Sequence, residues 1–181
     1  MVLQFACSRA GLVLYNLDPS LAIQDPTKSS EALKAALELT KANVLISQEA
    51  ADDVNYVRIV HDLIPELKAF RVTEGMPFVT PRFPDLRMCI LSGFDDDDKH
   101  CWFPLRHMIV PSNNLQAYVD ESSITDKIPL AGSLKLTPEG VPTALDKPKT
   151  HSQIVKDNLW PVYCSILNKE FQDVEGIGVE F

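Results

Sequence analysis

Three short apolar runs, separated by segments with helical spacing, constrain the fold of this chain most. They are LVLY at 12–15, NVLIS at 43–47 and LRMCILS at 86–92. Each run has the composition and length of a buried β-strand. Nearly continuous apolar strands that alternate with helices are typical of a parallel sheet covered by helices. The pattern therefore predicts an α/β fold, with a partial parallel sheet and flanking helices in a βαβαβ unit over residues 1–93.

The two segments between these runs have the spacing of amphipathic helices. In the first segment leucines and alanines recur on one face, and Ser29 or Ser30 is placed to cap the first turn. A second helix is predicted from Ala50 to about Leu63, because apolar residues continue at helical spacing until Pro65 interrupts them. Both helices are expected to cover the sheet.

The N-terminal residues predict the end of a further helix. The apolar pattern of residues 2–10 fits its last turns, and Gly11 then provides the C-cap. Only Arg9 is basic and no basic region precedes the apolar run, so neither a secretory signal nor an Arg-rich transit peptide is visible. The sequence does not decide whether residues were removed ahead of Met1.

The second half of the chain is less regular than the first. Residues 94–149 are rich in proline, which predicts an irregular region broken into short pieces. Residues 150–172 then have the apolar spacing of a C-terminal helix, which Pro161 should kink or divide. A length of 181 residues suits one ordinary domain. We therefore predict a single domain over residues 1–181.

Charge and hydropathy exclude two classes of partner. The formal net charge is −8, from 17 Lys and Arg against 25 Asp and Glu. This balance argues against nucleic acid, and against an anionic membrane surface, as the main ligand. No stretch of eighteen apolar residues occurs, so the sequence predicts no transmembrane helix.

The sequence contains no strong metal or redox motif. The four cysteines are scattered without a C-x-x-C pair, which suits reduced, buried thiols better than a disulfide framework or a zinc site. The acidic run DDDD at 95–98 lacks the spacing of a calcium loop and is expected to be a solvated loop. We predict no metal site and no cofactor. The cysteines are Cys7, Cys89, Cys101 and Cys164.

The histidines do not form a recognisable catalytic motif. Cys101 follows His100 directly, and adjacent residues in a strand point to opposite faces, so this pair is poorly placed for proton transfer. The motifs H-E-x-x-H, G-x-S-x-G and G-x-G-x-x-G are absent. We therefore predict no catalytic residue. The histidines are His61, His100, His107 and His151.

The stretch LAGSLKLTPEGV at 130–141 has some of the residues of a phosphate-binding loop. Such a loop needs glycines that let backbone N–H groups approach the anion, hydroxyls that donate, and a lysine that supplies charge. Glycines are few here, and Glu139 would repel a phosphate. The candidate residues are Ser133, Lys135, Thr137, Pro138, Glu139 and Gly140.

Four stretches of the chain resemble the N-terminal region of the AMP-forming acyl-CoA synthetase family, the adenylate-forming or AMP-binding enzymes. They follow the order of that family's helix end, strand, turn, helix and strand over residues 3–93. The stretches are ACSRAGLVLYNLDPSL at 6–21, EALKAALELTKANVLIS at 31–47, IPELK at 64–68 and LRMCILSG at 86–93.

The same resemblance extends to the candidate phosphate loop. The family's loop has the form Y-[ST]-S-G-T-T-G-x-P-K-G-V, and Pro138, Gly140 and Val141 match its end. The Gly-Thr-Thr-Gly centre is replaced by SLKL, and Glu139 stands where the family has a lysine. The resemblance implies ATP and acyl-adenylate chemistry in the family, and the lost residues imply a degenerate, truncated pseudoenzyme here.

Truncation of such a domain would leave apolar surface for another protein to cover. The leading expectation is therefore a non-catalytic structural or accessory subunit of a stable hetero-complex. A mitochondrial inner-membrane complex, such as ATP synthase or a respiratory-chain complex, is the specific expectation by analogy. Two alternatives stay open. One is a module that binds a nucleotide, CoA or an acyl ligand without catalysis, and the other is an enzyme fragment completed by another chain.

Overall fold

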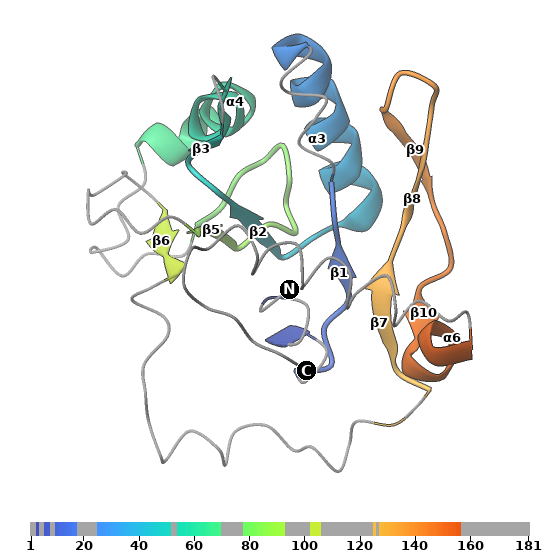
Figure 1. The fold of residues 1–181 in the computed structure, drawn as a ribbon. Helices are drawn as coiled ribbons and strands as arrows, with labels where there is room; N and C mark the ends of the chain where they lie inside the picture. Colours follow the sequence, from blue (N-terminus) through green and yellow to red (C-terminus); the bar gives the residue numbers. More distant parts are fainter. Residues whose placement is uncertain are drawn as a thin grey trace, which may run out of the picture. The chain divides into compact units, whose positions relative to one another are not determined.

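The computed structural model describes residues 3, 6–7, 10–17, 25–51, 54–69, 78–92, 102–105, 125 and 127–156. These residues form a mixed α/β fold that includes a parallel sheet, which confirms the predicted fold class (Figure 1). The chain divides into two compact units, which are described separately below. The first unit comprises Met1–Asn16, Asn114–Ser133 and Asp146–Phe181, and the second comprises Leu17–Asn113 and Leu134–Leu145.

A parallel sheet of three strands forms the centre of the second unit. Its order is β2 (Val44–Ser47), β5 (Met88–Leu91) and β6 (Phe103–Pro104), and both pairings are parallel. Leu45 lies opposite Cys89 in the register. The strands predicted at 43–47 and 86–92 are thus confirmed, and they are neighbours.

Helix α3 (Pro26–Thr40) begins earlier than the sequence analysis predicted. The carboxylate Oδ1 of Asp25 accepts hydrogen bonds from the N–H groups of Thr27 at 2.9 Å and Lys28 at 3.2 Å. Pro26 at the first helical position has no N–H to satisfy and a φ angle suited to a helix. The prediction of a cap at Ser29 or Ser30 is therefore wrong, because Asp25 and Pro26 start the helix one turn earlier.

The helix predicted from Ala50 is shorter than expected. Two short strands, β3 (Ala50–Ala51) and β4 (Val54–Asn55), instead form an antiparallel pair before the helix. Helix α4 (Tyr56–Leu63) follows, and the side-chain oxygen of Asn55 caps it by accepting the Arg58 N–H at 2.8 Å. The apolar spacing thus predicted that residues 56–63 are helical and that the helix ends at Leu63. It did not predict the start, which the Asn55 cap sets.

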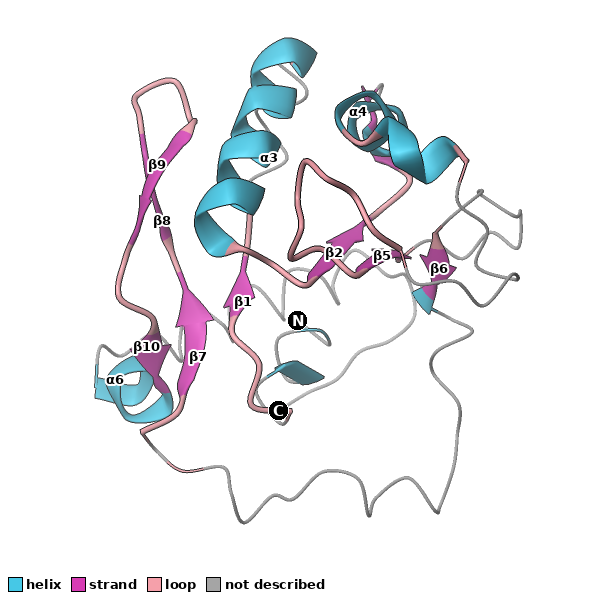
Figure 2. Cartoon of the chain, turned by 180° about the vertical axis from the view of Figure 1, so that it is seen from behind, coloured by secondary structure: helices cyan, strands magenta, loops and turns pink. Residues whose placement is uncertain are grey.

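The helices of the second unit cover one side of its sheet. Figure 2 shows α3 and α4 on the same side of β2 and β5. The short 3₁₀ helix η1 (Pro65–Lys68) follows α4 and buries Leu67 completely. One cluster of buried side chains joins these elements, and its members are Leu37, Val57, Val60, Ile64, Leu67, Phe78, Phe83, Leu86, Cys89, Leu91 and Trp102.

The first unit contains a second small sheet. Strand β7 (Pro129–Gly132) lies between β1 (Leu14–Tyr15), which is parallel to it, and β10 (Lys149–Thr150), which is antiparallel. The strand expected at 12–15 is present, but it pairs with β7 and not with β2. A β-carbon on Gly132 would overlap the Tyr15 ring, so this pairing needs a glycine at that position.

The N-terminal cap agrees with the prediction. Gly11 has a φ angle of 68°, in the left-handed region that suits glycine. The Leu12 N–H donates to the Cys7 carbonyl at 2.8 Å, which is the long hydrogen bond that closes a helix C-terminus. Gly11 therefore ends the N-terminal helical segment, as the sequence indicated.

The described part of the proline-rich region consists of short strands. Pro129 and Pro142 are each the first residue of a strand, where a missing N–H is tolerated. Helix α6 (His151–Lys156) is the described beginning of the predicted C-terminal helix, and Pro161 with the rest of 157–172 lies outside the described residues. Among the helices that the structure describes, none has the length and apolar composition that crossing a membrane requires.

Candidate functional site

The candidate phosphate loop lies on an antiparallel hairpin of the second unit. Its strands are β8 (Leu134–Leu136) and β9 (Pro142–Leu145). Leu134 lies opposite Leu145, and Lys135 lies opposite Ala144. Helix α3 packs against β9, so one side of the hairpin is supported by the body of the unit (Figure 1).

A tight turn joins the two strands. The Gly140 N–H donates to the Thr137 carbonyl at 2.9 Å, and Gly140 has a φ angle of 86°. Proline at the second position and glycine at the fourth are the residues that a type I turn followed by a left-handed residue favours. The sequence Thr137-Pro138-Glu139-Gly140 therefore encodes a hairpin turn.

Three backbone N–H groups of this turn, those of Thr137, Gly140 and Val141, donate within the hairpin. The Thr137 N–H donates to the Val141 carbonyl at 2.9 Å, and the Val141 N–H donates to the Thr137 hydroxyl oxygen at 3.1 Å. Pro138 has no N–H. A phosphate-binding loop instead directs its N–H groups at the anion and leads into a helix N-terminus. Here a strand follows the turn instead of a helix. The hydrogen-bonded N–H groups of the turn donate to oxygens of Thr137 and Val141 and not to a ligand.

The remaining candidate residues lie at separate positions, one before β8, one within β8 and one in the turn. Ser133 belongs to the first unit, where its hydroxyl is 3.3 Å from Oδ2 of Asp146 and its carbonyl accepts the Asp146 N–H at 3.0 Å. Lys135 is exposed in β8, and its carbonyl accepts the Thr143 hydroxyl at 3.1 Å. Glu139 is exposed at the tip. The structure thus places five of the six candidates on one hairpin and Ser133 directly before it in the chain, and it does not bring them together around one point.

The hairpin also exposes leucines that the sequence analysis did not single out. Leu134 and Leu136 are two residues apart in β8, and Leu145 lies opposite Leu134. The register shifts between Lys135 and Leu136, so Leu136 lies opposite Pro142. Leu136 is 50% exposed and Leu145 is 40% exposed. The alternation Leu-Lys-Leu ahead of a turn sequence is the signal that predicts such a hairpin.

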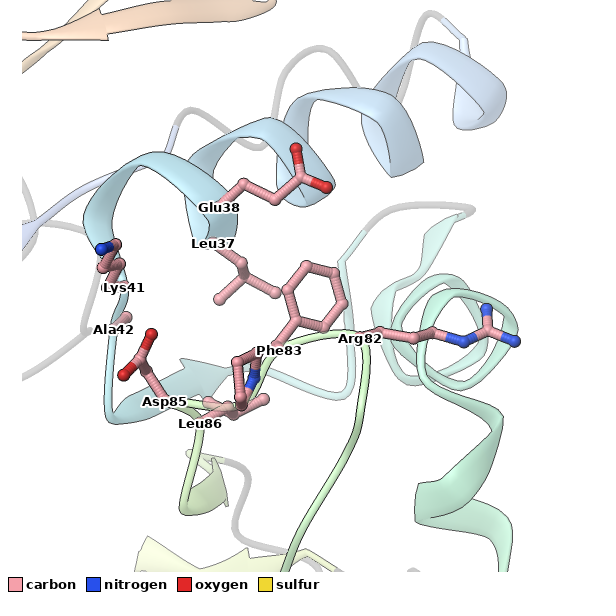
Figure 3. Close-up of a pocket in the computed structure, with 9 residues that line it drawn as sticks. Leu37, Glu38, Lys41, Ala42, Arg82, Phe83, Asp85 and Leu86 are labelled. Atoms are coloured by element: carbon pink, nitrogen blue, oxygen red, sulfur yellow. The ribbon is translucent and has the colours of Figure 1, made fainter.

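A small pocket lies beside the C-terminus of α3. Its volume is about 190 Å³, below the roughly 300–1,000 Å³ of most ligand pockets. Figure 3 shows the side chains of Leu37 and Phe83 next to each other at its centre. Arg82 extends away from them, and it donates to the Leu63 carbonyl at 3.2 Å and pairs with Glu66 at 3.6 Å. The lining residues are Leu37, Glu38, Lys41, Ala42, Arg82, Phe83, Pro84, Asp85 and Leu86.

One histidine has a clear structural contact. Nε1–H of Trp102 donates to Nε2 of His61 at 2.9 Å, and this bond joins α4 to the start of β6. The acceptor nitrogen must be unprotonated, so His61 is neutral with its proton on Nδ1 in this arrangement. Trp102 is a member of the buried cluster. The contact therefore has the character of a core hydrogen bond.

Of the four cysteines, the structure describes two. Cys89 is 1% exposed within the core of the second unit, which confirms a buried thiol at this position. Cys7 is half-buried, and this burial raises the pKa of its thiol above the ordinary value. Cys101, Cys164, His100, His107 and the acidic run at 95–98 lie outside the described residues.

Among the described residues no group of three or more histidine, cysteine, aspartate or glutamate side chains is placed to hold a metal ion. The comparisons give no family for the chain. No protein-family model matches it, and no curated protein does either.

Proposed function

We propose that this protein is a non-catalytic structural or accessory subunit of a larger protein assembly, built on a degenerate acyl-CoA synthetase-like domain. The observation that carries the proposal is the β8–β9 hairpin. The N–H groups of Thr137, Gly140 and Val141 donate within the hairpin, and Leu136 and Leu145 are substantially exposed. Neighbouring exposed apolar side chains are typical of a surface that another protein covers.

The charge of the turn supports a structural role over phosphate binding. Glu139 lies at the tip of the hairpin, where a phosphate would meet a carboxylate. Glu139 is exposed, and two like charges at about 4 Å in water repel each other by roughly 1 kcal/mol, which opposes phosphate binding. The turn's backbone offers little compensation, because the N–H groups of Gly140 and Val141 already have acceptors.

The assembly is proposed to be a mitochondrial inner-membrane complex, such as ATP synthase or a respiratory-chain complex. This part of the proposal rests on the resemblance to acyl-CoA metabolism enzymes and on no site in the structure. The net charge of −8 favours partner surfaces that are basic. In the proposal the chain attaches to the complex through other subunits.

Copurification tests the proposal. An affinity-tagged chain should elute from cell extracts, on size-exclusion chromatography, in a stoichiometric assembly far larger than its own 20.2 kDa. The chain produced alone should associate nonspecifically or require its partners for solubility. A stable, well-behaved monomer in both preparations would contradict a role as a permanent subunit.

The alternative function, a module that binds a nucleotide, CoA or an acyl ligand without catalysis, is favoured by one observation. The pocket beside α3 has an apolar centre at Leu37 and Phe83 and a cation at Lys41. Its small volume weighs against it. Isothermal titration calorimetry with ATP, AMP and an acyl-CoA decides between the two, since submillimolar binding would favour the module.

A further inference from the structure

We draw no further inference here: the strongest candidate, the pocket of about 190 Å³ beside the C-terminus of α3, belongs to the site already described, and nothing in the structure shows which ligand or side chain would fill it.

Discussion

At the residue scale, backbone conformation explains why single positions matter in the hairpin turn. Gly140 has a φ angle of 86°, which an L-residue with a β-carbon adopts only with strain. The preceding Pro138 has the fixed φ angle that suits the second position of the turn. Pro138 and Gly140 therefore have a local structural reason to be present at these positions.

Replacing Gly140 by alanine should destabilise the protein by about 1–2 kcal/mol, because alanine would be held in the left-handed region. Urea denaturation measures the change in the free energy of unfolding. Gly140→Asn should cost less, since asparagine tolerates this region better. Glu139→Ala at the exposed neighbour is the control and should change stability by less than about 0.5 kcal/mol. Equal effects for all three would contradict the assigned turn.

The thiol of Cys7 should titrate above the ordinary pKa of cysteine, because partial burial disfavours the thiolate. The Cys7 thiol therefore ionises at a lower pH in the unfolded chain than in the folded chain. The contribution of this thiol to stability is therefore fully present below the unfolded pKa and is lost as pH rises through the folded pKa.

Alkylation by iodoacetamide, mapped by mass spectrometry, checks this expectation. The rate at Cys7 should rise at higher pH in the folded protein than in the same protein unfolded in urea. Cys89, which is buried in the core, should resist alkylation in the folded protein at all of these pH values. Identical pH profiles for folded and unfolded Cys7 would show that its environment does not shift the pKa.

At the element scale, capping residues decided the boundaries that periodicity left open. The apolar spacing identified the helices that became α3 and α4, but their first residues were set by Asp25 and Asn55. Ser29 and Ser30 are also favourable caps, so local preference alone does not choose among them. The helix begins after Asp25, because Pro26 is favoured at the first helical position.

Asp25→Ala should destabilise the protein by about 0.5–2 kcal/mol, because the N–H groups of Thr27 and Lys28 lose their common acceptor. Thermal or urea unfolding measures the loss. Ser29→Ala and Ser30→Ala are matched controls within the first turns of α3, and each should be neutral or slightly stabilising. If either serine variant lost more stability than Asp25→Ala, the result would contradict the cap at Asp25 and favour the helix start at Ser29 or Ser30 that the sequence predicted.

At the scale of the whole molecule, contacts between distant segments hold each unit together. Trp102 and His61 are 41 residues apart, and their hydrogen bond links α4 to β6 beside the buried cluster of the second unit. Strand β1 pairs with β7, which lies more than a hundred residues later in the chain. Neither contact has a local signal in the sequence.

A double-mutant cycle with Trp102→Phe and His61→Ala should give a coupling free energy of about 0.5–1.5 kcal/mol, the usual net value of one hydrogen bond. The cycle separates this bond from the packing that each substitution also changes. Chemical denaturation of the four proteins supplies the values. A matched cycle between Trp102 and the exposed residue Val79 should show no coupling. Zero coupling between Trp102 and His61 would contradict the assigned bond.

Local patterns in the amino-acid sequence were enough to predict the α/β class, the strands at 43–47 and 86–92, the end of α4 and the cap at Gly11. Each depends on apolar periodicity or turn chemistry within a few residues. The tertiary structure decided that β1 pairs with β7, that the chain has two compact units, and that the suspected phosphate loop is a hairpin turn whose donors face inward. Strand partners are chosen by hydrogen bonds and packing between segments far apart in the chain, and a local pattern does not encode that choice.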